Sequence, residues 1–170
     1  MNETQTMKAL FLDRDGVINE DTGYVFRTEH FRFVEGIFEL CLTAMNKGYG
    51  IIVITNQSGI ERGYFTEADF QSLTKWMLSR FMAAGVAITE VLHCPALSGP
   101  DRKPNPGMFL TAKRKHGIDM SASVSLGDKE RDIQAGRNAG VGMNVLLSPI
   151  RPESKADQVI ATLKEMEGLL

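Results

Sequence analysis

Four segments of this 170-residue chain combine carboxylates, cations, hydroxyls and amides closely enough to do chemistry. In the first, Asp13 and Asp15 are separated by one residue and followed by Gly16. This arrangement allows a tight turn whose backbone N–H groups face an anion. The second segment offers hydroxyl and amide donors, the third two adjacent cations, and the fourth acids on a turn before a helix. The segments are 13–19, 55–59, 102–106 and 127–132.

Together these groups would support phosphoryl transfer. Mg²⁺ prefers oxygen ligands and keeps several waters, so Asp13 and Asp128 with one backbone carbonyl would hold it. A carboxylate beside the metal can attack phosphorus to form an aspartyl-phosphate. A second acid, here Asp15, would protonate the leaving oxygen and then deprotonate the attacking water. A lysine and a hydroxyl would stabilise the charge on the phosphoryl oxygens, usually the largest catalytic contribution.

Each segment taken alone has a less specific interpretation. An Asp-x-Asp-Gly at a strand end is often only a solvated turn, and the four segments in this order are what favour a phosphatase site. We expect Asp132 to orient Lys129 or a loop rather than to bind the metal, and Gly127 to serve the turn alone. The basic run 113–116 lies at a predicted helix end, where cations suit the helix dipole, so we interpret it as a solvated face.

The four segments can meet only if the chain folds into a parallel sheet. Lys8–Asp13 and Ile51–Ile54 are apolar without alternation, which is typical of parallel strands covered on both faces. Thr66 and Asn105 are the expected N-caps of two helices. This alternation predicts an α/β fold, a Rossmann-like parallel sheet with helices on both faces, in which ligands bind beyond the carboxyl ends of the strands. The other predicted strands are 90–93, 124–126, 144–147 and 157–160. The predicted helices are one with its apolar stripe at 37–44 that Gly48 closes, then 67–84, 106–115, 133–139 and a last helix ending at 169.

Length and composition indicate one domain spanning 1–170, with residues 1–7 as a flexible tail. The net charge of −2 gives no electrostatic footprint for nucleic acid or an anionic membrane. We find no apolar run suited to a signal peptide or membrane span, and Cys41 and Cys94 form no C-x-x-C pattern. We therefore expect a cytoplasmic protein, monomeric by default, whose partner is a small molecule rather than a nucleic acid or a membrane.

The order D-x-D-G-V, T-N-Q, K-P and G-D-x-x-x-D resembles the haloacid dehalogenase-like superfamily of Asp-nucleophile phosphatases. Further matching segments resemble the D-glycero-D-manno-heptose-1,7-bisphosphate 7-phosphatase family and its relative, the histidinol-phosphatase domain. The resemblance extends from about Leu10 to Leu147. The further segments are Gly23-Tyr-Val, Phe33-x-Glu-Gly36, Thr55-Asn-Gln-Ser-Gly-Ile60, Arg62-Gly63, Phe65-Thr66, Cys94-Pro95 and Arg102-Lys-Pro-Asn-Pro-Gly-Met108.

The resemblance implies a role for each matching residue. Asp13 would be nucleophile and metal ligand, Asp15 the general acid/base and a metal ligand through its backbone carbonyl, and Asp128 the second carboxylate ligand of Mg²⁺. Thr55 and Lys103 would bind the transferring phosphoryl group. The substrate pocket would be lined by Asn19, Asp21, Thr22, Gly23, Tyr24, Asn56, Gln57, Ser58, Arg102 and Lys129.

The chain departs from the family pattern in one loop. Many relatives carry a structural zinc loop with Cys-Pro-His-x-Pro followed by a Cys-x-Cys pair. Here Cys94-Pro95 is followed by Ala96 and Leu97, and Ser98–Asp101 leads directly into Arg102. A lone thiol cannot form a tetrahedral site, so we expect no zinc. The spacings between the four segments leave no room for an inserted cap domain, which implies a capless phosphatase.

The resulting hypothesis is a Mg²⁺-dependent phosphomonoesterase that removes the 7-phosphate of a heptose 1,7-bisphosphate, on the route to nucleotide-activated heptose for surface polysaccharide. Histidinol phosphate or another small sugar phosphate is the alternative substrate. An alternative of another class is a catalytically silent sugar-phosphate-binding module. The presence of Asp15 beside the expected metal ligands argues against this module, because a pure binder has no use for a spare acid.

Overall fold

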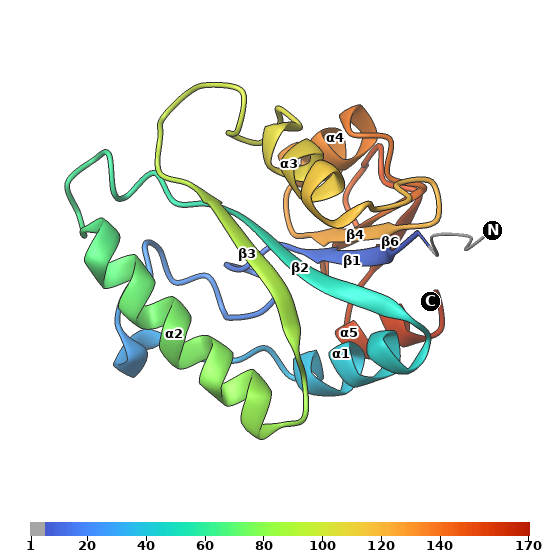
Figure 1. Cartoon of the computed structure of the whole chain (residues 1–170), viewed down its shortest axis with the longest axis horizontal. Helices are drawn as coiled ribbons and strands as arrows, with labels where there is room; N and C mark the ends of the chain where they lie inside the picture. Colours follow the sequence, from blue (N-terminus) through green and yellow to red (C-terminus); the bar gives the residue numbers. More distant parts are fainter. Residues whose placement is uncertain (1–5) are drawn as a thin grey trace.

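The computed structural model describes residues 6–170 and contains one sheet of six parallel strands, in the order β3-β2-β1-β4-β5-β6 (Figure 1). Because every strand runs in the same direction, the segments that follow the strands gather at one edge of the sheet. The predicted α/β parallel fold is confirmed. The strands are β1 (Lys8–Leu12), β2 (Tyr49–Asn56), β3 (Ile88–Cys94), β4 (Val124–Gly127), β5 (Met143–Leu147) and β6 (Gln158–Ile160).

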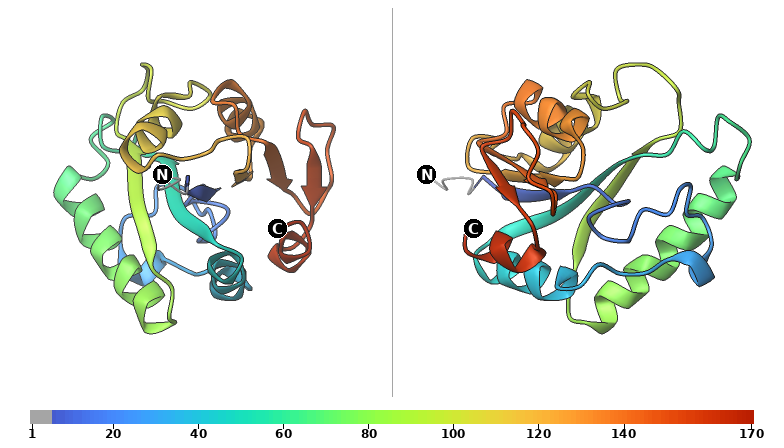
Figure 2. Two further views of the ribbon diagram at one scale, coloured as in Figure 1. Left: turned by 45° about the vertical axis from the view of Figure 1, so that its right-hand side comes forward. Right: turned by 180° about the vertical axis from the view of Figure 1, so that it is seen from behind.

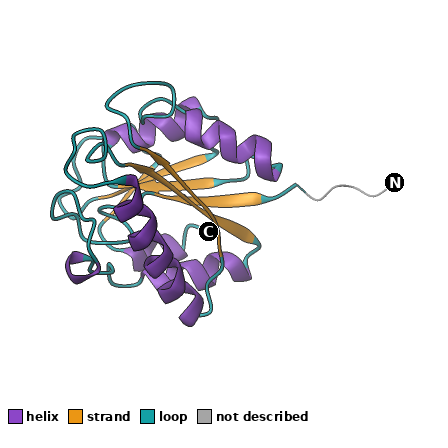
Figure 3. Cartoon of the chain, turned by 60° about the vertical axis from the view of Figure 1, so that its left-hand side comes forward, coloured by secondary structure: helices purple, strands orange, loops and turns teal. Residues whose placement is uncertain are grey.

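Helices cover both faces of the sheet (Figures 2 and 3). On β1, Leu10 and Leu12 pack into a core with α1, α2 and α5, whereas Ala9 and Phe11 pack into a second core with α3 and α4. Both faces of β1 are therefore apolar, which explains why its sequence does not alternate. The helices are α1 (Ile37–Asn46), α2 (Glu67–Ala83), α3 (Gly107–His116), α4 (Glu130–Asn138) and α5 (Leu163–Glu167), with a 3-10 turn, η1 (Thr28–His30).

Two expected helix caps have different outcomes. The Thr66 hydroxyl accepts from the Asp69 backbone N–H at 3.0 Å and Asp69 accepts from the Thr66 backbone N–H at 2.8 Å, so α2 begins with the predicted cap. The cap prediction for Asn105 is wrong, because Pro106 is the N-cap of α3 and makes no side-chain capping bond. The Asn105 amide instead donates to the Gly99 carbonyl at 2.9 Å and ties the preceding loop together.

Several element boundaries differ from the sequence prediction. β2 extends beyond Ile51–Ile54 at both ends, and α4 begins at Glu130 rather than at 133. Residues 1–5 of the predicted tail lie outside the described residues. Met7, the last residue of that tail, forms a parallel bridge with Ile118 and accepts from the Asp119 backbone N–H at 2.8 Å.

The segments that connect the strands are short loops and single helices. Between β1 and β2 lie a loop with η1 and then α1, and between β2 and β3 lie a loop and α2. The described chain thus has no folded insertion at either position, as the capless prediction requires. Within residues 6–170, none of the helices combines the length and the apolar character needed to cross a membrane.

Candidate active site

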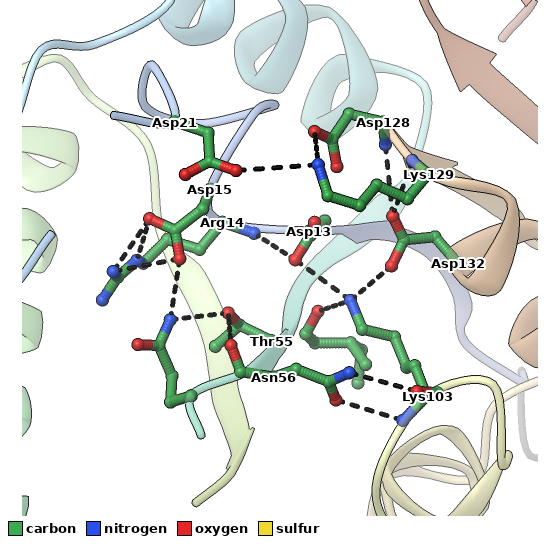
Figure 4. Close-up of polar contacts among 12 residues, drawn as sticks. Asp13, Arg14, Asp15, Asp21, Thr55, Asn56, Lys103, Asp128, Lys129 and Asp132 are labelled. Atoms are coloured by element: carbon green, nitrogen blue, oxygen red, sulfur yellow. Dashed lines mark hydrogen bonds and ion pairs between the residues drawn. The ribbon is translucent and has the colours of Figure 1, made fainter. Parts of the chain in front are cut away.

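The four polar segments converge at the carboxyl edge of the sheet. Asp13 follows β1, Thr55 and Asn56 end β2, and Asp128 follows β4. Lys103 reaches the same place from the loop after β3 (Figure 4). This is the edge at which open α/β sheets bind their ligands.

Lys103 is the cation at the centre of this cluster. Its side chain is 2% exposed, and its ammonium donates to Asp13 Oδ1 at 3.0 Å and to the Ile54 carbonyl at 2.8 Å. It also forms an ion pair with Asp132 Oδ1 at 2.8 Å. Asn56 fixes the Lys103 backbone from both sides, because its amide donates to the Lys103 carbonyl at 3.1 Å and accepts from the Lys103 N–H at 3.0 Å. The lysine is therefore positioned by its backbone as well as by its charge.

Asp15 is held by three hydrogen-bond donors. Arg14, which is 1% exposed, pairs with Asp15 Oδ1 at 2.9 Å and also donates to the Val25 carbonyl at 2.7 Å. Asn19 donates to Asp15 Oδ1 at 3.0 Å, and Gln57 donates to Asp15 Oδ2 at 2.9 Å. The carboxyl group of Asp15 thus has a fixed orientation beside Asp13.

The carboxylates of Asp13, Asp128 and Asp132 form a cluster that fits a divalent cation. One oxygen from each lies within 4.8 Å of the others. Asp128 Oδ1 is buried and has no hydrogen-bond partner in the described structure, which leaves it free to bind a cation. Asp132 Oδ1 likewise accepts no hydrogen bond within the described residues, but the Lys103 ammonium lies 2.8 Å from it in an ion pair. Asp132 Oδ2 accepts from the Asp128 and Lys129 backbone N–H groups at 3.2 and 3.1 Å. Asp13 and Asp128 are therefore the better candidates for a Mg²⁺ site, since carboxylate oxygens are its usual protein ligands.

Gly16 makes the approach of Asp128 possible. Its φ of +94° suits glycine, and a Cβ built on it would lie 2.1 Å from Asp128 Oδ2. The missing side chain at Gly127 allows Asp132 to approach in the same way, because a Cβ built on Gly127 would lie 2.2 Å from the Asp132 Cβ. Gly127 thus permits a close packing contact, which the expectation of a turn-only role did not include.

The three clustered carboxylates carry more negative charge than Lys103 and Lys129, the two lysines that pair with them, neutralise. Burial raises the pKa of Asp13 well above its usual range, and the neighbouring carboxylate of Asp132 raises it further against the opposing effect of Lys103. Burial likewise raises the pKa of Asp128. Burial alone would lower the pKa of Lys103, but the charges of Asp13 and Asp132 outweigh it and raise that pKa. A divalent cation between the carboxylates would relieve this imbalance.

A polar cavity of about 320 Å³ opens at Asp13, Asp15 and Lys103. Its walls carry four cationic side chains besides Lys103: Arg62, Arg102, Lys129 and Arg131. A second hollow of about 850 Å³ lies between α1 and α5 and reaches Gly16 and Asp128. Three glutamates and one lysine line that hollow, so its charge is unfavourable for a phosphate. The smaller cavity is the one whose chemistry suits a phosphorylated ligand.

Comparison with known proteins agrees with this geometry. The HAD-hydrolase-like family model matches residues 101–165. The D-glycero-alpha-D-manno-heptose-1,7-bisphosphate 7-phosphatase of Burkholderia mallei is 50% identical over 150 residues, covering 82% of this chain and 79% of the relative. The corresponding protein of Campylobacter jejuni is 45% identical over 160 residues, covering 94% of this chain and 93% of the relative. The chain belongs to the heptose-1,7-bisphosphate 7-phosphatase family. It is thus a haloacid dehalogenase-like phosphatase, as the motifs indicated.

Solved structures of the heptose-bisphosphatase family share the fold. The D,D-heptose 1,7-bisphosphate phosphatase of Burkholderia thailandensis is 28% identical, with a TM-score of 0.68 over 94% of this chain and 96% of its own. The enzyme of B. bronchiseptica, solved with magnesium and phosphate, is 24% identical, with a TM-score of 0.86 over 96% of this chain and 97% of its own. The second match supports the fold alone.

Most residues expected in the pocket of this family member line the cavity, but three do not. Asn19 and Thr55 are fully buried, and both belong to the hydrogen-bonded groups beneath Asp15: Gln57 donates to Asp15 and to the Thr55 hydroxyl at 2.9 Å each. Thr22 is exposed and lies outside the lining. The expected pocket residues that do line the cavity are Asp21, Gly23, Tyr24, Asn56, Gln57, Ser58, Arg102, Lys103 and Lys129. Of the expected catalytic and metal-binding acids, Asp13 and Asp15 line it, whereas Asp128 lines the larger hollow.

The structure also adds residues that the sequence analysis missed. Arg14 gave no signal, since an arginine between two aspartates is typical of a solvated turn. Its burial depends on the Val25 carbonyl, which the chain brings back only in the folded protein. Arg62 and Arg131 line the cavity without having been predicted there.

Proposed function

We propose that this chain hydrolyses the 7-phosphate of a D-glycero-D-manno-heptose 1,7-bisphosphate with the help of Mg²⁺. The observation that carries the proposal is the contact of Lys103 with Asp13 at 3.0 Å, beside the carboxylate of Asp128 and under a cavity lined by cations. A nucleophilic carboxylate, a fixed ammonium and a polar pocket are the parts that phosphoryl transfer requires. The sugar comes from the names of the relatives, which are heptose bisphosphatases.

In this proposal, a carboxylate oxygen of Asp13 attacks phosphorus and the bond to the sugar oxygen breaks, giving an aspartyl-phosphate. The two described hydrogen bonds of the Asp13 carboxylate, from the Arg14 N–H and the Lys103 ammonium, both end on Oδ1. Oδ2 is therefore the oxygen that we assign to the attack. Lys103 stabilises the negative charge that builds on the phosphoryl oxygens, and the buried setting makes this stabilisation stronger than it would be in water.

Asp15 is the proposed general acid and base. It gives a proton to the leaving sugar oxygen in the first step. In the second step a water oxygen attacks the phosphorus of the aspartyl-phosphate, Asp15 takes a proton from that water, and the bond from phosphorus to the Asp13 oxygen breaks, which releases inorganic phosphate and restores the Asp13 carboxylate. Its bonds to Arg14, Asn19 and Gln57 hold the carboxyl group in one orientation, so its distance from the reacting oxygen is set before substrate arrives. Asn19 and Gln57 would then act by positioning Asp15.

We assign the Mg²⁺ ligands to Asp13, Asp128 and the backbone carbonyl of Asp15. When bound, the ion would neutralise these acids and withdraw charge from the phosphoryl oxygens. The absence of zinc, the single domain over 1–170, the monomeric state and the cytoplasmic location remain predictions. Elemental analysis, limited proteolysis, light scattering and cell fractionation would test them in that order.

The proposal is tested by phosphate release in the presence of Mg²⁺. The substrates are the α and β anomers of the heptose 1,7-bisphosphate, fructose 1,6-bisphosphate and histidinol phosphate. We expect turnover of a heptose bisphosphate to exceed that of the other two, with loss of the phosphate at C7, and no turnover by Asp13→Asn. Both anomers are needed because relatives named for each resemble this chain at similar identity. Failure to turn over any substrate would contradict the proposal and favour a binding module.

A further inference from the structure

Two loops from different strands meet at the mouth of the cavity. One follows β2 and spans 57–66, and the other follows β3 and spans 95–106. Each loop supplies an arginine to the cavity lining, Arg62 from the first and Arg102 from the second. The relative position of the two loops therefore decides where these cations lie.

Glu61 links the loops. Its carboxylate accepts a hydrogen bond from the Leu97 backbone N–H, and its own backbone N–H donates to the Pro95 carbonyl at 3.3 Å. The two bonds run in opposite directions between the loops, and the residue that follows in the chain is Arg62. Within the described residues, segment 95–98 makes only one other hydrogen bond to a residue outside its loop. In that bond the Cys94 thiol donates to the Ala96 carbonyl at 3.8 Å.

The same short stretch holds Arg102. The Arg102 guanidinium donates to the Ala96 carbonyl at 3.2 Å, and Ala96 lies between the two residues that Glu61 contacts. A displacement of 95–97 would therefore remove the acceptor that orients Arg102.

We propose that Glu61 is a positioning residue for substrate binding, which acts by clamping 95–97 and so orienting Arg102 toward the substrate. The inference rests on the proposed function, because it assigns Arg102 to the sugar-phosphate pocket. Glu61 itself is exposed and absent from the cavity lining, so it does not contact the substrate. A charge-assisted hydrogen bond to one backbone N–H is strong enough to shift a loop equilibrium by a few-fold.

The test compares Glu61→Ala, Glu61→Gln and Arg102→Ala with the double variant Glu61→Ala/Arg102→Ala. Glu61→Ala is expected to raise the KM for the heptose bisphosphate by about 2- to 10-fold with kcat near the wild-type value. Glu61→Gln keeps an oxygen that accepts from the Leu97 N–H, so it should recover most of the wild-type KM. Because both residues act through one cation, the double variant should be no worse than Arg102→Ala alone. Glu153→Ala, an exposed glutamate outside the cavity lining, is the matched control and should change neither constant.

Amide hydrogen exchange tests the contact between Glu61 and 95–97 in the absence of substrate. Leu97 should exchange faster in Glu61→Ala than in the wild type, and at the wild-type rate in Glu153→Ala. Unchanged exchange at Leu97, or effects of Glu61→Ala and Arg102→Ala on KM that multiply, would overturn the inference. Faster exchange in a protein that does not turn over heptose bisphosphate would support the clamp while refuting the proposed substrate.

Discussion

Lys103 is the residue on which the charge balance of the site depends. Its ammonium lies 3.0 Å from Asp13 and 2.8 Å from Asp132, and its side chain is almost fully buried. Removing one partner of a buried ion pair leaves an uncompensated charge, which costs about 3–5 kcal/mol. We therefore expect Lys103→Met to lose that much stability in urea unfolding, in addition to its activity.

Lys129→Met is the control for this substitution. The Lys129 side chain is 44% exposed where it pairs with Asp128, so losing its charge should cost less than about 1 kcal/mol. Equal losses of stability in the two variants would contradict the claim that the buried ion pairs of Lys103 stabilise the folded protein.

Gly16 is a second residue whose identity the site requires. In Gly16→Ala the new methyl group would displace the Asp128 carboxylate, and the substitution also carries the cost of a positive φ, about 1–2 kcal/mol. Gly23→Ala is a matched control, because Gly23 has a φ of +87° but nothing within 4 Å of the added Cβ. Calorimetric titration should show that Gly16→Ala weakens Mg²⁺ binding by about 10- to 100-fold and that Gly23→Ala does not. Equal Mg²⁺ affinity in the two variants would contradict the metal assignment.

At the scale of the elements, the first turn of α2 makes stability depend on pH. The Thr66 backbone N–H donates to Asp69 and, with the Thr66 side chain, lowers the pKa of that carboxyl group. A group with a lowered folded pKa adds stability that is present above its unfolded pKa and is lost as pH falls through the folded value. We expect Asp69→Asn to unfold more easily near neutral pH and to lose less stability than the wild type below about pH 4.

Two further variants belong to the same unfolding experiment, one at the α2 cap and one control outside α2. Thr66→Ala should cost about 1 kcal/mol at neutral pH, because it removes the N-cap hydroxyl. Glu153→Gln, on an exposed side chain without a described hydrogen bond, should follow the wild-type curve. Parallel acid profiles for Asp69→Asn and the wild type would refute the account of this cap.

The elements also show where sequence reasoning succeeds and where it fails. Periodicity places α4 at 133–139 because the apolar stripe begins at Ile133. The helix in fact begins at Glu130, because Asp132 reaches back to the Lys129 backbone N–H at 3.1 Å. Asn105 has the right residue type for a cap, but the loop before it offers the Gly99 carbonyl as a competing partner. Local patterns thus locate the elements, whereas their ends depend on contacts that form only in the folded chain.

For the molecule as a whole, the topology could be predicted because β1, β2, β4 and β5 follow the pattern of buried parallel strands. The convergence of the acids and Lys103 follows from that topology, since each comes after a strand. The burial of Arg14 and the pairing of Lys103 with Asp132 could not be predicted. They depend on side-chain directions at the sheet edge and on partners more than ten residues away.

Mg²⁺ binding should couple to the stability of the whole domain. A ligand present at about a hundred times its Kd stabilises the folded state by about 2.7 kcal/mol, or roughly 5 to 10 °C in Tm for a chain of this length. Because the pKa values of Asp13 and Asp128 are raised, protons compete with the ion, and the increase in Tm should shrink as pH falls. Scanning calorimetry should show no increase for Asp128→Asn. A full increase in that variant would refute the site.

The most direct measurement is the location of the phosphoryl group during turnover. The wild type and Asp15→Asn are mixed with the heptose bisphosphate and Mg²⁺, quenched in acid within one turnover, digested and analysed by mass spectrometry. The account predicts one phosphoryl group on the peptide that carries Asp13, slower appearance and slower loss of that group in Asp15→Asn because Asp15 serves both steps, and none in Asp13→Asn. Rapid phosphate release with no phosphorylated peptide, or a phosphoryl group on another residue, would contradict it.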